Sequence, residues 1–183
     1  MPIKLGSTNF GNIYLGSTKI GSAYLGSVKV YGPSQPPVLP AYTIRCKFTS
    51  GYTPSRGTTQ TLVDANENIW DIWANYDTWD NLFANSTYLE KIIAANLTGV
   101  ISIKFAFSGC SNLTYASLSN TNSVTNMQDA FSGCTSLKAV PHIDTNSVTD
   151  MQYMFYNCYA VESGALALYQ QVATKTLIKR YCF

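Results

Sequence analysis

Four cysteines recur at a fixed spacing and are the residues best suited to chemistry. Cys110, Cys134 and Cys158 are 24 residues apart, and Cys182 follows 24 residues later. Thiols brought together could form a disulfide or, with the single histidine His142, a zinc site or a Cys–His dyad. A zinc site or dyad needs further companions, and these thiols fall in an apolar column. We therefore interpret them as buried thiols packed as hydrophobic groups, with a disulfide between neighbouring repeats as the alternative.

Acidic residues offer a second kind of chemistry. The segment Asp64-Ala65-Asn66-Glu67-Asn68 resembles the start of a calcium loop, but Ile69 and Asn75 stand where glycine and glutamate belong. We predict a polar turn there. Three nearby acids are interpreted as helix caps or solvated groups: Asp71, Asp77 and Asp80. Nothing calls for a glycosidase pair, and no phosphate loop, nucleophile elbow or dinucleotide fingerprint is visible. We predict no catalytic, metal-binding or cofactor-binding residues.

The elements that would position these residues are repeats of 24 residues. One column holds Phe83, Phe107, Phe131 and Phe155, and another holds Leu89, Leu113, Leu137 and Val161. A fixed period of this length is typical of stacked units. Two capping boxes, Thr125 to Gln128 and Thr149 to Gln152, predict a short helix in each unit, and a strand follows it. The predicted fold is therefore an α/β solenoid of helix-plus-strand units over residues 76–163.

The repeat resembles a known family. The stretch Val148-Thr149-Asp150-Met151-Gln152-Tyr153-Met154-Phe155-Tyr156-Asn157-Cys158 matches the unit of leucine-rich repeats of the bacterial surface-antigen (BspA-like) type. This resemblance implies a leucine-rich-repeat array and a binding habit, usually adhesion, without naming a ligand. Four outward strand positions are the candidate ligand contacts: Glu90, Tyr115, Ser117 and Lys138. The alternative is an ordinary solvated face.

Both ends of the array should be capped, which gives a domain over residues 41–183. In the cap at residues 41–75, strands at 43–49 and 59–63 are predicted to form a hairpin. For the cap at residues 164–183, one amphipathic helix is predicted, from Glu162 to about Thr176. Its predicted inward residues are Leu166, Leu168, Tyr169 and Val172.

Residues 1–32 hold a second repeat, of ten residues, in which Leu5-Gly6-Ser7 returns as Leu15-Gly16-Ser17 and Leu25-Gly26-Ser27. Each decad is predicted to form a strand, a Gly-Ser turn and a strand. Such small hairpins need a partner to bury surface. The residues assigned to anchoring are Tyr14, Leu15, Lys19, Ile20, Tyr24, Leu25, Lys29 and Val30. Residues 33–40 contain four prolines and are predicted to be a stiff linker.

These decads resemble the N-terminal attachment segments of virion proteins from tailed phages, notably those of gut bacteria. The resemblance implies a segment that assembles on the particle with other capsid or tail proteins, as a homotrimer. The array would then be an outer knob whose ligand is a host cell-surface polysaccharide or protein.

Composition excludes several classes. Charged residues make up 12% and the net charge is +2, so no basic surface for nucleic acid is expected. No signal peptide and no membrane-spanning run is visible. The missing signal predicts a protein made in the host cytoplasm. Together with the resemblance to phage attachment segments, it implies a non-enzymatic virion protein, with a head fibre favoured because the chain is short. The alternatives are a tail fibre, a bacterial cell-surface adhesin and a polymer-degrading enzyme.

Overall fold

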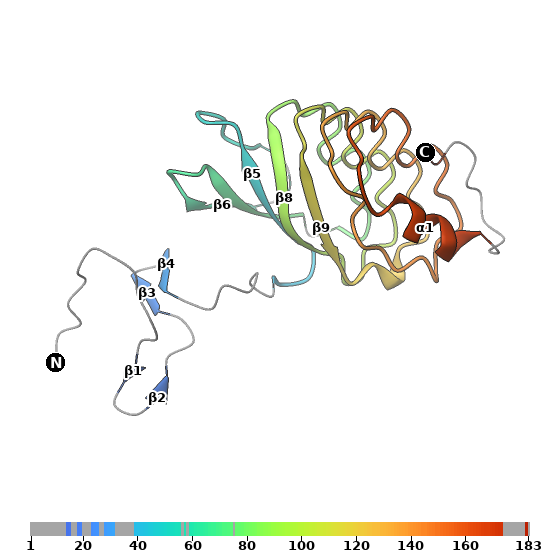
Figure 1. Ribbon diagram of the computed structural model, residues 1–183. Helices are drawn as coiled ribbons and strands as arrows, with labels where there is room; N and C mark the ends of the chain where they lie inside the picture. Colours follow the sequence, from blue (N-terminus) through green and yellow to red (C-terminus); the bar gives the residue numbers. More distant parts are fainter. Residues whose placement is uncertain are drawn as a thin grey trace. The chain divides into compact units, whose positions relative to one another are not determined.

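The computed structural model describes residues 14–15, 18–19, 23–25, 28–31, 39–55, 57, 59–74, 76–173 and 182 (Figure 1). The chain divides into two compact units, Met1–Pro36 and Pro37–Phe183. In its described residues the first unit contains two antiparallel strand pairs, and the first predicted decad lies outside them. In one, β1 (Tyr14–Leu15) pairs with β2 (Thr18–Lys19), and in the other, β3 (Ala23–Leu25) pairs with β4 (Val28–Tyr31).

The second unit is built around a five-stranded mixed sheet in the order β6-β7-β5-β8-β9. Its strands are β5 (Thr43–Phe48), β6 (Thr59–Asp64), β7 (Ile69–Trp73), β8 (Leu89–Asn96) and β9 (Tyr115–Ser119). Only β8 and β9 run parallel among these neighbours, because they begin successive 24-residue units, while the other pairs are antiparallel. Figure 1 shows β8 and β9 side by side, with the turns of the later units beyond them.

Alternation explains β5 at the centre of the sheet. Ile44, Cys46 and Phe48 are fully buried, while Arg45 and Lys47 point to the other face. The predicted hairpin between the first two strands is wrong. The strand β5 pairs with β7 and β8, and β6 pairs only with β7, a strand that the sequence analysis did not identify.

The predicted α/β solenoid of leucine-rich repeats is also wrong. The described part of the chain is mostly β, its sheet is open, and it contains no array of helices alternating with strands. The 24-residue spacing instead appears as a row of isolated parallel bridges that joins Thr78, Ser102, Asn126 and Asp150. Where helices were predicted, each unit forms a series of tight turns.

Backbone hydrogen bonding explains why these segments are not helices. In the first unit, the N–H groups of Trp79, Asn81 and Phe83 donate to carbonyls of the next unit, at 2.8, 3.0 and 2.7 Å. The intervening N–H groups of Leu82 and Ala84 donate three residues back, at 3.0 and 3.2 Å. An α-helix would direct each of these donors four residues back. The chain satisfies its donors alternately within one unit and between units.

Left-handed residues interrupt any helix in the same segments. Each unit has two of them, four positions apart: Asn81 and Asn85, Phe105 and Gly109, Asp129 and Gly133, and Tyr153 and Asn157. A right-handed helix excludes positive φ. The predicted capping boxes are wrong for the same reason. The hydroxyls of Thr125 and Thr149 donate at 3.0 Å to carbonyls of the preceding unit instead of accepting from their own.

The core of this unit is a stack of aromatic rings. Phe83, Phe107, Phe131 and Phe155 stack with centroid distances of 6.1, 5.1 and 5.5 Å. All four rings are buried, and the leucine column packs with them. Repeating one apolar side chain per unit therefore builds a continuous core.

The predicted C-terminal helix is confirmed over part of its length, and residues 174–181 lie outside the described residues. Among the described residues it is α1, Ala165–Val172. Leu168 and Val172 are buried as predicted, but Leu166 and Tyr169 are exposed. The helix therefore packs through a narrow stripe.

Candidate functional site

The solvent side of the five-stranded sheet carries polar groups together with the exposed ring of Tyr115. We call this surface the outer sheet face and define it by Arg45 and Lys47 of β5, Asp71 of β7, Glu90 and Lys91 of β8, and Tyr115 and Ser117 of β9. Strand register places Lys47 opposite Lys91, and Lys91 opposite Tyr115. A β-bulge lies between Lys47 and Phe48, where β8 has one extra residue, Glu90.

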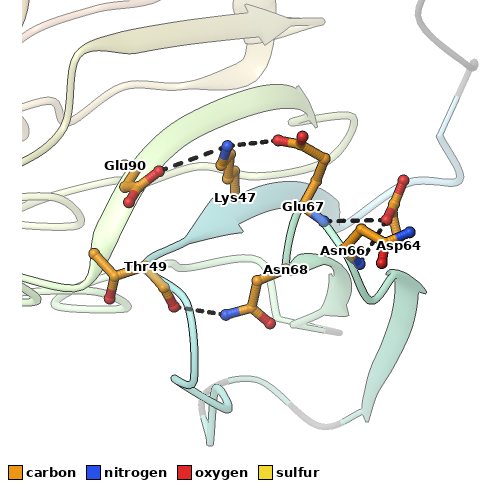
Figure 2. Close-up of polar contacts among 7 residues, drawn as sticks. All are labelled: Lys47, Thr49, Asp64, Asn66, Glu67, Asn68 and Glu90. Carbon is orange, nitrogen blue, oxygen red and sulfur yellow. Dashed lines mark hydrogen bonds and ion pairs between the residues drawn. The ribbon is translucent and has the colours of Figure 1, made fainter.

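Lys47 lies between two carboxylates on this face (Figure 2). Its Nζ is 2.6 Å from Glu67 Oε2 and 3.9 Å from Glu90 Oε2. The hydrogen bond to Glu67 raises the pKa of Lys47, so the lysine is protonated at neutral pH. The two carboxylates therefore flank one cation, and the three side chains form a charged cluster on this face.

Arg45 and Asp71 make the most ordered ion pair of the face. Arg45 Nε and Nη2 each donate to a different carboxylate oxygen of Asp71, both at 2.6 Å. Side-chain exposures of 18% and 26% show that the pair is partly shielded from water. A bidentate pair of this kind fixes both side chains.

The structure places Glu90 on β8 and Tyr115 and Ser117 on the adjacent β9, while Lys138 lies in the next unit, outside these strands. The Glu90 carbonyl accepts from Thr114 N at 2.9 Å, and the Thr114 carbonyl accepts from Lys138 N at 3.2 Å. Tyr115 follows Thr114 and its ring is 51% exposed. Ser117 lies two residues further along β9 on the same face. Lys138 forms an exposed ion pair with Glu162, at 3.6 Å.

The predicted anchoring residues belong to the first unit. Tyr14 is paired with Lys19, and Leu15 with Thr18, in the first hairpin. Tyr24 is paired with Lys29, and Leu25 with Val28, in the second. Val30 lies in β4, and Ile20 is outside the described residues.

The predicted polar turn after β6 is confirmed. Asp64 Oδ1 accepts from the backbone N–H groups of Asn66 and Glu67 at 2.9 and 3.1 Å (Figure 2). Asn68, with φ of 52°, donates through Nδ2 to the carbonyls of Thr49 and Tyr52. The turn therefore positions Glu67 beside Lys47 and fixes the loop after β5.

The cysteines are free thiols, as the favoured interpretation predicted. Each repeat thiol donates 3.1 Å to the carbonyl of a phenylalanine 27 residues earlier: Cys110 to Phe83, Cys134 to Phe107 and Cys158 to Phe131. Burial raises the pKa of Cys110 to about 12 and that of Cys158 to about 11. A raised pKa disfavours the reactive thiolate.

Cys182 does not share the role of the other three. Its carbonyl accepts from Phe155 N at 2.7 Å. In earlier units the corresponding acceptors are Ala106, Ala130 and Met154. Cys182 therefore occupies the position that Ala106, Ala130 and Met154 hold in earlier units. The 24-residue spacing predicted another position, because the segment between Met154 and Cys182 is four residues longer than one repeat.

His142 borders two small cavities at the C-terminal end, together with Ile143 and Gln171. Within the residues that the structure describes, no three His, Cys, Asp or Glu side chains gather in a way that could hold a metal ion. The same part of the chain contains no helix that is long and apolar enough to span a membrane.

Sequence reasoning missed Arg45, Lys47 and Glu67. It also interpreted Asp71 as a helix cap or a solvated group, which is wrong, because Asp71 lies in β7 and pairs with Arg45. The alternation of β5 was a usable signal for Arg45 and Lys47, because Ile44, Cys46 and Phe48 had to face the core. No local signal identifies their acidic partners, which come from the turn before β7 and from β7 itself.

The family model described as "Mycoplasma protein of unknown function, DUF285" matches residues 65–175, which is more than half of the chain. The match begins after the two hairpins and covers β7 through α1. No curated protein and no solved structure matches the chain.

Proposed function

We propose that this chain, which belongs to the DUF285 family, is a non-enzymatic structural virion protein of a tailed phage. In this proposal Met1–Pro36 anchors the chain to the particle, and Pro37–Phe183 is displayed as a binding module. A head fibre is the preferred location. The outer sheet face is the surface that meets a host cell-surface polysaccharide or protein.

One observation supports the anchoring role above all others. The two hairpins repeat the same pairing ten residues apart, Tyr14 with Lys19 and Tyr24 with Lys29. Isolated two-stranded hairpins are marginally stable in water. A hairpin repeated at a constant ten-residue spacing suits a segment that gains its stability by assembling with other chains. A homotrimer on the virion would provide such partner chains.

The outer sheet face supports the display role. Arg45 is paired with Asp71, and Lys47 is paired with Glu67 and Glu90, so these groups offer directional hydrogen bonds with little net attraction. Tyr115 adds an exposed ring, and Tyr combines apolar area with a polar tip. Weak contacts of this kind become effective when many copies act together.

The test is to locate the chain on particles from the source by antibody-labelled electron microscopy. Labelled heads are expected; labelled tails would favour the tail-fibre alternative. Label confined to bacterial envelopes would identify a cell-surface adhesin and overturn the proposal.

Anchoring is tested separately by mixing particles that lack the protein with the full chain or with a chain lacking residues 1–32. The full chain should bind and the shortened chain should not. Tyr115→Ala is the matched control, because its change lies on the outer sheet face, and it should bind particles normally. Equal binding of the shortened chain would refute the anchoring role.

A further inference from the structure

The last repeat unit differs from the others in its surface residues. Tyr156 and Tyr159 replace smaller residues at two positions, and Tyr153 stands where the earlier units have Asn81, Phe105 and Asp129. The position of Tyr156 is Ala84, Ser108 and Ser132 in the earlier units, and that of Tyr159 is Thr87, Ser111 and Thr135. The bridge between Asn126 and Asp150 keeps the last unit in register with the one before it, so these positions are structurally equivalent.

Two of these rings line a cavity of about 380 Å³. Phe155, Val161 and Ala165 contribute apolar surface to it, and Asn157 and Cys158 contribute polar atoms. None of the seven lining residues is charged. Cavities of about 300 to 1,000 Å³ with mostly apolar walls and a few polar groups are typical of small-ligand sites.

The tyrosine rings are both exposed and held in place. Tyr159 is 79% exposed, and its hydroxyl donates to Asn157 Oδ1 at 2.7 Å. Tyr156 makes an edge contact with Tyr153 at 5.6 Å between ring centroids. No described residue accepts a hydrogen bond from Asn157 Nδ2, so this amide can donate to a ligand.

We propose that this cavity, the tyrosine pocket, binds one unit of a neutral saccharide. The apolar face of a sugar ring packs on an exposed aromatic ring, and its hydroxyls need donors and acceptors such as the tyrosine hydroxyls and Asn157. The uncharged lining selects against acidic sugars, because nothing there compensates a buried carboxylate. The proposal rests on the proposed function in one respect, that Pro37–Phe183 binds a surface polymer, and it names the chemical class of that polymer.

The experiment uses the full chain on an array of neutral and acidic glycans, followed by calorimetry and saturation-transfer NMR with a neutral oligosaccharide from the array. Binding of neutral glycans is expected. Tyr159→Ala should weaken it by about tenfold, the effect of losing one well-placed aromatic contact. Tyr159→Phe keeps the ring and should weaken it less. The matched control Tyr76→Ala removes an exposed tyrosine that lies outside both the tyrosine pocket and the outer sheet face, and it should leave this binding unchanged.

Thermal unfolding of each variant checks that the fold is retained. We expect this for the Tyr159 variants, because an exposed side chain contributes little to the core. The proposal is overturned if only acidic glycans or only peptides bind, if no glycan binds, or if Tyr156→Ala and Tyr159→Ala bind neutral glycans like the unmodified chain. If particles carry the chain and adhere to host cells without help from the tyrosine pocket, the proposed function stands and this inference fails. If neutral glycans bind through the tyrosine pocket but no particle carries the chain, this inference stands and the proposed function fails.

Discussion

Phe131 lies inside the stack of four phenylalanines, with Phe107 at 5.1 Å on one side and Phe155 at 5.5 Å on the other. Phe131→Ala leaves a cavity between two rings that cannot close without shifting whole units. We expect a loss of about 3 to 5 kcal/mol in the free energy of unfolding, measured by urea titration.

Tyr115→Ala is the control for Phe131→Ala, because it removes an aromatic ring that is half exposed. It should change the free energy of unfolding by less than about 0.5 kcal/mol. If Phe131→Ala is as mild as this control, the stacked rings are not the centre of the core.

The buried thiols predict a loss of stability in alkali. Burial raises the pKa of Cys110 to about 12, against an ordinary value of 9.0. Above pH 9 the unfolded chain releases this proton while the folded chain keeps it. The free energy of unfolding should therefore fall by about 1.4 kcal/mol per pH unit for this thiol, while below pH 9 it contributes no pH dependence.

Cys110→Ala separates this effect from the titration of tyrosines and lysines. The variant should be less stable at pH 8, because it leaves a small cavity, yet its stability should decline less steeply between pH 9 and pH 11. Urea titrations at half-unit steps measure both slopes. Equal slopes would mean that Cys110 is not protected from ionisation in the folded chain.

The turn segments depend on left-handed residues, and their glycines are not equivalent. Gly109 has φ of 72°, and a Cβ added there would meet Asn85 Oδ1 of the preceding unit. Gly133 has φ of 74°, and its closest neighbour is Gly109 Cα at 3.5 Å, an ordinary contact. Gly133→Ala should cost about 1 to 2 kcal/mol, the penalty of the left-handed backbone alone, and Gly109→Ala should cost more.

Gly51→Ala is the matched control for these two variants. It has φ of 81° and open space around the added Cβ, so it reports backbone strain without a contact. The expected order of destabilisation is Gly109→Ala above Gly133→Ala, with Gly133→Ala close to Gly51→Ala. A reversed order in thermal unfolding would show that the units do not stack in this register.

These segments also show what the sequence could predict and what it could not. The columns of Phe, Cys and Leu revealed the 24-residue period, because every unit buries the same face. The local structure of these segments could not be predicted. The four-residue spacing of Met127 and Phe131 fits a helix, and the alternating turns that the structure shows produce the same spacing. Gly109 and Gly133 signalled left-handed backbone, but Phe105 and Tyr153 adopt it without any such signal.

The outer sheet face, like the turn segments, could be predicted only in part. The strand pattern identified Glu90 and Tyr115 as outward residues, because Leu89 and Ala116 beside them face the core. The pairing of Lys47 with Glu67 and Glu90 depends on β5 lying between β7 and β8, which are distant from it in the sequence. Contacts set by such non-local pairing have no local sequence signal.

The division of the chain into two units makes a prediction for the molecule as a whole. Every residue of the core cluster lies between Ile44 and Cys182, so the larger unit should not need the first 36 residues to fold. A chain shortened to Pro37–Phe183 should unfold at the same temperature as the full chain in calorimetry, because it loses none of this buried surface.

Light scattering should show the full chain as a trimer and the shortened chain as a monomer, since assembly is assigned to the paired hairpins. Tyr115→Ala in the full chain should remain trimeric. A lower unfolding temperature for the shortened chain would mean that the first unit contributes to the fold of the second, and a shortened chain that is still trimeric would place the assembly surface on the larger unit.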